Sequence, residues 1–200
     1  MSKIVRAFFT LVFVTLSAYS QAPSQYGCSL TEANSPSVRG LRLGMTIDQL
    51  QALFPGGVKR KEIKDALEKA KAATASEPVY LSFNPAVDSG KEQFAGVDSV
   101  SVGLLKGRVT DFGVGYVGAM WTTDEWVAKL SESFGLPALS AWTVGPSENP
   151  NKVLKCDGIE IEASTQGGSA SIRIRNTKAL AGNEDKANAA EEKRRRETKP

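Results

Sequence analysis

The sequence predicts an α+β fold: two tandem units, each a helix followed by an antiparallel meander, form one antiparallel sheet with helices on one face. Three observations support this prediction. Two similar capped helix starts lie 76 residues apart (122 − 46), stretches of alternating hydrophobicity follow each of them, and glycine-containing turns separate those stretches. Helices and strands that segregate in this way are typical of layered α+β domains.

The first twenty residues, 1–20, have the pattern of a secretory signal peptide. Lys3 and Arg6 precede an apolar run of about a dozen residues, and small residues follow it. An uncleaved membrane anchor is the alternative, but a spanning helix needs roughly 20 apolar residues. We therefore expect cleavage after Ser20, a secreted or periplasmic protein, and no integral membrane segment in the mature chain.

Composition divides the remainder into three parts. Residues 21–40 form a polar lead-in, 41–176 the α+β domain with half-repeats at about 41–118 and 119–176, and 177–200 a charged, disordered tail. Removing two of the 25 basic and none of the 22 acidic side chains with the signal lowers the formal charge from +3 to +1. A nearly neutral body lacks the concentrated basic field of a nucleic-acid-binding protein, so no nucleic-acid partner is expected. The basic run 193–196 is either a solvating charge cluster or a contact for an acidic surface.

The chain has two cysteines, Cys28 and Cys156. In an oxidising compartment they can form one disulfide, which would tie the lead-in to a strand near the end of the domain. Two alternatives remain open: both thiols are free, or Cys28 is a lipid-attachment site.

Each predicted unit begins with a capped helix. Thr46 and Thr122 start Thr-x-x-Gln and Thr-x-x-Glu boxes, in which the hydroxyl and the third side chain satisfy free backbone N–H groups. Apolar residues then recur four apart on one face of each helix, namely Leu50 and Phe54 in the first, and Trp126, Leu130 and Phe134 in the second. Chance similarity of two short helices is the alternative to a true repeat.

The rest of the first unit reads as a second helix and three strands. Strong helix formers fill residues 59–77, with Ile63 and Leu67 facing inward, and Pro78 ends the run. A strand follows at 79–83, and then a hairpin. Apolar residues alternate along both of its strands, at Val100, Val102 and Leu104 and at Phe112, Val114 and Tyr116. These two sets face the same side only if the loop between the strands has an odd number of residues. The predicted loop is 106–108, with Gly107 in the left-handed conformation.

The second unit contains two hairpin turns, Asp157-Gly158 and Gly167-Gly168. The second turn places Glu162 opposite Arg173 and Glu160 opposite Arg175. The other face of the same strands carries the aliphatic pairs, Ile161 with Ile174 and Ala163 with Ile172. The same strand register thus pairs opposite charges on the outer face and aliphatic side chains on the inner face, which supports it. Each cross-strand pair contributes roughly 0.2 to 1 kcal/mol to stability.

The stretch from Gly44 to Gly56, "GMTIDQLQALFPG", resembles an opening shared by two groups of exported proteins, and Thr122 to Gly135 resembles it loosely. One is the β-lactamase inhibitory protein group, and the other is the small lipoprotein of the outer-membrane barrel assembly machinery. The resemblance implies tandem helix-and-sheet units whose curved sheet binds a partner protein. The second copy departs from the pattern because Met120-Trp121 stands in place of Gly-Met and its second helix is missing, so no contact residue carries over.

Residues for common catalytic chemistry are missing. The chain has no histidine, which removes histidine-dependent triads and most zinc sites, and its distant cysteines form no Cys-x-x-Cys pair. Glu160 and Glu162 are the nearest carboxylate pair, but their alternation with arginines predicts a surface ladder. Gly113, Gly115 and Gly118 match a nucleotide-binding Gly-x-Gly-x-x-Gly only in letters, since no β-α-β unit surrounds them.

We therefore predict a non-catalytic module that needs no cofactor and binds a protein partner whose identity the sequence leaves open. Its candidate contact face consists of Gly113, Gly115, Glu160, Glu162, Arg173 and Arg175. A lipid or sugar carrier is the first alternative, and a histidine-free hydrolase with two carboxylates in one cleft is the second. Trp126 is expected in the core, whereas Trp121 and Trp142 either close the edge of the core or stack on a ligand.

Overall fold

The computed structural model describes residues 28–71, 77–89, 92–146 and 149–181. Its helices are α1 (Ile47–Leu53), α2 (Lys61–Lys71), α3 (Pro85–Asp88) and α4 (Thr123–Phe134), with 3-10 turns η1 (Glu32–Asn34), η2 (Gly57–Lys59), η3 (Glu92–Phe94) and η4 (Leu139–Ala141). Its strands are β1 (Val79–Phe83), β2 (Val97–Leu105), β3 (Arg108–Val117), β4 (Thr143–Val144), β5 (Asn151–Lys155), β6 (Ile159–Gln166) and β7 (Ser169–Asn176).

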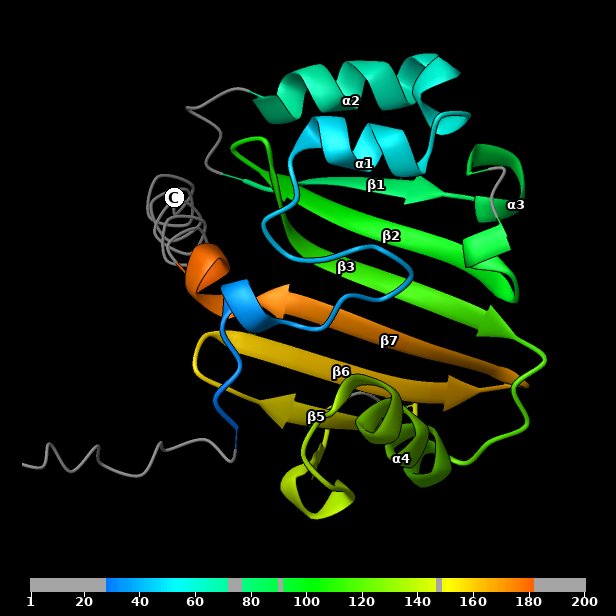
Figure 1. The fold of residues 1–200 in the computed structure, drawn as a ribbon, viewed down its shortest axis with the longest axis vertical. Coiled ribbons are helices and arrows are strands. Elements are labelled where there is room, and N and C mark those ends of the chain that lie inside the picture. Colours follow the sequence, from blue (N-terminus) through cyan, green and yellow to red (C-terminus); the bar gives the residue numbers. More distant parts are fainter. Residues whose placement is uncertain (1–27, 72–76, 90–91, 147–148, 182–200) are drawn as a thin grey trace, which may run out of the picture.

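The described strands form one seven-stranded antiparallel sheet in the order β1-β2-β3-β7-β6-β5-β4 (Figure 1). The last strand of each unit, β3 and β7, meet at the centre of the sheet, and they are antiparallel. A half-turn about an axis normal to the sheet therefore exchanges the two units, and such a rotation keeps the helices of both on the same face. The predicted α+β class with two tandem units and one antiparallel sheet is confirmed.

Both predicted capping boxes are present. The Thr46 hydroxyl accepts from the Gln49 backbone N–H and the Gln49 side chain accepts from the Thr46 N–H, and Thr122 and Glu125 repeat the arrangement. Gly135 ends α4 in the left-handed conformation at φ 63°.

The Gly-Met-Thr opening has a local structural reason. Gly44 is left-handed at φ 74°, and a Cβ there would lie 2.6 Å from a Glu32 carboxylate oxygen. Its N–H donates to the Val109 carbonyl, and the Val109 N–H donates back to the Met45 carbonyl. The motif thus fastens the start of α1 to the start of β3.

The core lies between the sheet and a layer of helices. α2 packs on β1 and β2 at one end of the sheet, and α4 packs on β5 and β6 at the other (Figure 1). The described part of the lead-in crosses the central strands between them, and it buries Cys28 and Val38. These two residues belong to the domain core although the composition of the lead-in is typical of a loop.

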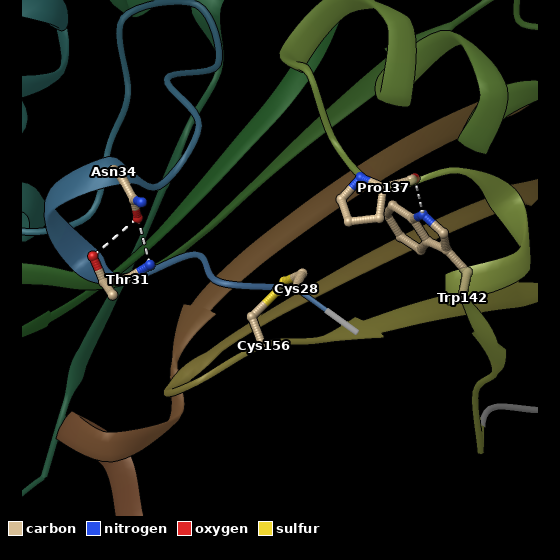
Figure 2. Close-up of a disulfide and its surroundings, with 6 residues drawn as sticks. All are labelled: Cys28, Thr31, Asn34, Pro137, Trp142 and Cys156. Carbon is tan, nitrogen blue, oxygen red and sulfur yellow. Dashed lines mark hydrogen bonds between the residues drawn. A yellow bond between two sulfur atoms is a disulfide. The ribbon is translucent and has the colours of Figure 1, made fainter. Parts of the chain in front are cut away.

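A disulfide joins Cys28 to Cys156 (Figure 2), with the two Cα atoms 5.0 Å apart and a sequence separation of 128 residues. Of the three alternatives left open by the sequence, the disulfide is the one present, and it fixes the lead-in to the turn directly after β5 rather than to the strand itself. Trp142 lies after η4 with 5% of its surface exposed, and its indole N–H donates to the Pro137 carbonyl at 3.1 Å. Of the two roles left open for Trp142, closing the edge of the core is the one that this burial supports.

The turns at Asp157-Gly158 and Gly167-Gly168 are confirmed, and all four predicted pairs between β6 and β7 are in register. The predicted three-residue loop at 106–108 is wrong. Arg108 already belongs to β3, and Lys106 and Gly107 form a two-residue turn with φ of 51° and 75°. The strand register shifts by one residue between Gly103 and Leu104. This β-bulge adds one unpaired residue to the hairpin, as a three-residue loop would have done, and so brings the apolar side chains of both strands to the same face.

Within the described ranges, no helix combines the length and apolar composition needed to cross a membrane. The predicted signal, residues 1–20, and the tail from residue 182 lie outside those ranges. Residues 177–181, at the start of the predicted tail, are helical.

Candidate functional site: the helix-free face of the sheet

The six residues predicted as a contact face lie on three adjacent strands. Glu160 and Glu162 on β6 are opposite Arg175 and Arg173 on β7, and Gly113 on β3 is opposite Arg173 on its other side. Gly115 is opposite Ser171 in the same way. Along β6 and β7 the four charged residues alternate with buried residues, so their side chains point away from the core and its helices. We call this side of the sheet the helix-free face.

Arg173 pairs with a carboxylate that the sequence analysis missed. Its Nε donates to both carboxylate oxygens of Asp111, at 2.9 and 3.1 Å, and its Nη2 also donates to Oδ2. The Asp111 side chain is 3% exposed and that of Arg173 41%. The hydrogen bonds to Asp111 raise the pKa of Arg173, so the guanidinium stays charged. Asp111 stands two residues before Gly113, and period-two alternation along β3 could have placed it on this face.

The predicted charge pair of Glu160 with Arg175 is confirmed, and Glu162 joins it. Arg175 Nη1 lies 3.4 Å from Glu160 and Nη2 lies 3.6 Å from Glu162. Asn151 on β5 also donates to Glu162, at 2.8 Å. Glu162 therefore pairs with Arg175, although the Cα register places it opposite Arg173.

Beside these charges lies a band of small residues, here called the small-residue strip and defined as Ser99, Ser101, Gly113, Gly115 and Ser171. Ser101 is opposite Gly113 and Ser99 is opposite Gly115 across β2 and β3. Both serines are exposed and both glycines are half-buried. No bulky side chain stands in the strip.

A pocket of about 490 Å³ lies on the β4 side of the charged residues. Its lining includes Glu160, Glu162 and Arg175 as well as the segment Val144–Pro146. Val144, at the edge of the sheet, is 78% exposed. The helix-free face thus offers a flat centre and a hollowed, charged rim.

A second hollow lies on the opposite, helical side, between α4 and the lead-in. Its volume is about 410 Å³, and its walls include Tyr116, Trp121 and Trp126. Trp126 is in the core as predicted, with 6% exposed, but Trp121 remains 38% exposed. The two indole rings stack with centroids 5.2 Å apart. We call this hollow the aromatic cleft.

Among the described residues, no group of three or more Cys, Asp or Glu side chains could hold a metal ion. A scan against protein-family models found no match, and neither did searches of curated proteins and of solved structures.

Proposed function

We propose that this protein is exported, has no catalytic role, and binds a partner protein across the helix-free face of its sheet. The observation that carries the proposal is the pair Gly113 and Gly115 at the centre of that face. Glycine inside a strand costs about 0.5–1 kcal/mol relative to alanine, so two in one strand need a reason.

The fold itself supplies no such reason. Neither Gly113 nor Gly115 has a positive φ. A Cβ on either would meet a serine hydroxyl, at 2.8 Å from Ser101 Oγ or 2.7 Å from Ser99 Oγ, and an exposed hydroxyl can rotate away.

Gly103, on the same face, is different. A Cβ there would lie 2.9 Å from the Tyr80 ring and 3.1 Å from the Asp111 Cβ, so its own neighbours require glycine. For Gly113 and Gly115, close approach of an external surface is the explanation that remains.

The exposed groups indicate what kind of surface this partner presents. The strip offers serine hydroxyls, while Asp111, Glu160 and Glu162 already form ion pairs with Arg173 and Arg175. A strongly charged partner gains little from such a face. We propose a flat, neutral protein surface with hydrogen-bonding groups. The resemblance of Gly44–Gly56 to two groups of exported binding proteins supports the same proposal.

The arrangement of Glu160 and Glu162 also favours binding over hydrolysis. An acid and base pair for glycoside cleavage needs two carboxylates that face one cleft and are free to act on a substrate. Here both carboxylates share the Arg175 guanidinium and both are partly exposed, at 21% and 28%. The disulfide between Cys28 and Cys156 supports export, because such bonds persist in oxidising compartments.

A wedge on the strip tests the binding face. Ser101→Trp places an indole over Gly113, whereas Ser140→Trp places one on the exposed surface of η4, on the helical side. Charge reversal of Arg173 is a poorer probe, because it would strand the buried Asp111 carboxylate and disturb folding.

Immobilised wild type and both variants, each with native circular dichroism, are incubated with detergent-solubilised cell-envelope extract, and bound proteins are quantified by mass spectrometry. We expect at least one protein that wild type and Ser140→Trp retain equally and that Ser101→Trp retains at least tenfold less. If no protein shows this pattern, or if Ser101→Trp instead abolishes a dimer seen by light scattering, the proposal of a heterologous partner is wrong. For export, the intact mass of protein from the periplasmic or culture fraction should match a chain that begins at Gln21 and contains one disulfide.

A further inference from the structure

The described sheet has two edges, and the one formed by β1 is the longer. β1 has five residues and pairs with β2 on one side only, so no described strand lies on its other side (Figure 1). The backbone groups on the free side of an edge strand can pair with a strand of another molecule, which leads to dimers or aggregates. In this protein, side chains occupy part of that free side.

Arg60 and Asp88 lie at the free side of β1, near its end. Arg60 Nη2 donates to the Ser82 carbonyl at 3.0 Å and to Asp88 Oδ2 at 2.9 Å. The same Asp88 oxygen accepts from the Asn84 backbone N–H at 2.8 Å. Ser82 and Asn84 are two positions apart in extended backbone, so their backbone groups point to the same side of the strand. The pair thus occupies one acceptor and one donor that an added strand would need.

A close-fitting Pro-Gly-Gly turn between α1 and α2 brings the pair together. The Gly56 N–H donates to the Asp88 carbonyl at 2.7 Å, and a Cβ on Gly56 would lie 2.7 Å from the Val87 carbonyl oxygen. A Cβ on Gly57 would lie 2.8 Å from the Phe83 ring. The turn therefore lies directly against α3 and the end of β1. The arginine that follows it stands just before α2, which packs on β1 from the helical side.

The opposite edge is closed in a different way. β4 consists of Thr143 and Val144 alone, and Gly145 and Pro146 follow it. Two residues offer too few hydrogen bonds to hold an added strand, and proline has no backbone N–H to donate. Both edges of the described sheet are therefore poor templates, but only β1 depends on an ion pair for this.

We propose that Arg60 and Asp88 close the β1 edge against strand addition, and that the partner they exclude is a second copy of this chain. Without the pair, the β1 strands of two molecules can meet antiparallel about a two-fold axis, because the same edge is then complementary to itself. With the pair in place, alternation leaves only the groups of Tyr80 and the Ser82 N–H for an added strand. This inference concerns the edge of the sheet and does not depend on the function proposed for the helix-free face.

Self-association of the purified, oxidised protein tests the proposal, and the chain offers a matched control. Arg60→Met/Asp88→Ala removes both caps and strands no charge. Arg173→Met/Asp111→Ala makes the same substitutions in the ion pair of the helix-free face. The arginine and aspartate side chains are 40% and 2% exposed in the edge pair, and 41% and 3% exposed in the control pair. The control therefore loses an equivalent pair without uncapping an edge strand.

Sedimentation equilibrium measures the mass at protein concentrations up to about 1 mM, where weak complexes form. Amide hydrogen exchange followed by NMR locates the contact. We expect wild type and the control variant to have the same mass, and Arg60→Met/Asp88→Ala to have twice that mass at high concentration. In the edge variant, exchange of the Tyr80 and Ser82 amides should be about tenfold slower at high than at low concentration, because pairing protects them.

The proposal is overturned if the edge variant keeps the mass of wild type, or if the control associates to the same extent. It is also overturned if the mass rises without slower exchange at Tyr80 and Ser82. If the circular dichroism of Arg60→Met/Asp88→Ala is not native, Arg60→Met/Asp88→Asn decides. There an amide fills the space of the carboxylate and can still accept from the Asn84 N–H, while the Ser82 carbonyl loses its donor. This variant should also associate, and a mass equal to that of wild type counts against the proposal.

Discussion

Removing the Arg173 guanidinium should destabilise the fold more than removing the carboxylate with which it pairs. The Asp111 carboxylate is 3% exposed, and Arg173 is its charge partner on the helix-free face. Arg173→Met leaves that carboxylate buried without compensation. Asp111→Asn instead leaves a neutral amide and a guanidinium that is already 41% exposed and can turn toward water.

The magnitudes follow from this asymmetry in exposure. Deleting one partner of a buried ion pair costs roughly 3–5 kcal/mol. The 41% exposure of Arg173 admits water to this pair, so we take the lower end, about 3 kcal/mol, for Arg173→Met. Loss of charge-assisted hydrogen bonds with no stranded charge should cost about 1 kcal/mol in Asp111→Asn. The double variant should resemble Asp111→Asn, because it strands no charge.

Urea unfolding of the oxidised protein at pH 7, followed by tryptophan fluorescence and circular dichroism, measures these costs. Arg175→Met is the control, since its glutamate partners are 21% and 28% exposed and can be solvated after the change. It should cost about 1 kcal/mol. If Asp111→Asn costs as much as Arg173→Met, or if the two effects add within about 0.5 kcal/mol, the reasoning about the stranded charge is refuted.

Three further predictions concern the disulfide, the α4 cap and the glycines. Replacing Cys28 and Cys156 by alanine should lower the free energy of unfolding by about 4–5 kcal/mol, the loop-entropy value for 128 residues, and calorimetry checks it. The pKa of Glu125 is lowered, first by the Thr122 backbone hydrogen bond, below its ordinary 4.5. The stabilisation that Glu125→Ala removes should therefore be present above pH 4.5 and shrink as the pH falls through the folded-state pKa. Gly113→Ala should be neutral or stabilising by up to about 1 kcal/mol, whereas Gly135→Ala, at φ 63°, should cost about 1 kcal/mol; equal losses in urea unfolding would contradict the account of the strip.

The fold could be predicted where the sequence encodes short-range signals. The capping boxes at Thr46 and Thr122 depend on residues three apart, and the turns at 157–158 and 167–168 fix the register of the strands they join. The site was partly predictable for the same reason, since period-two alternation places Glu160 and Glu162 on one face.

Contacts between segments that are distant in the chain could not be predicted in this way. Asp111 and Arg173 meet because β3 and β7 are neighbours at the junction of the two units, 62 positions apart. The bulge near Gly103 was missed because a three-residue loop satisfies the same parity. The aromatic cleft was missed because Arg39 reaches Tyr116 only when the lead-in crosses the sheet.

Local patterns in the chain are enough to establish that each unit starts with a capped helix and continues in strands with one aliphatic and one polar side. Hydrophobic periodicity and turn-forming residues act over a few positions, so they can be recognised in the amino-acid sequence. Which strand of one unit lies beside which strand of the other, and therefore which charges pair across that junction, became clear only from the folded molecule. Those choices depend on packing between segments remote in sequence, which no local pattern records.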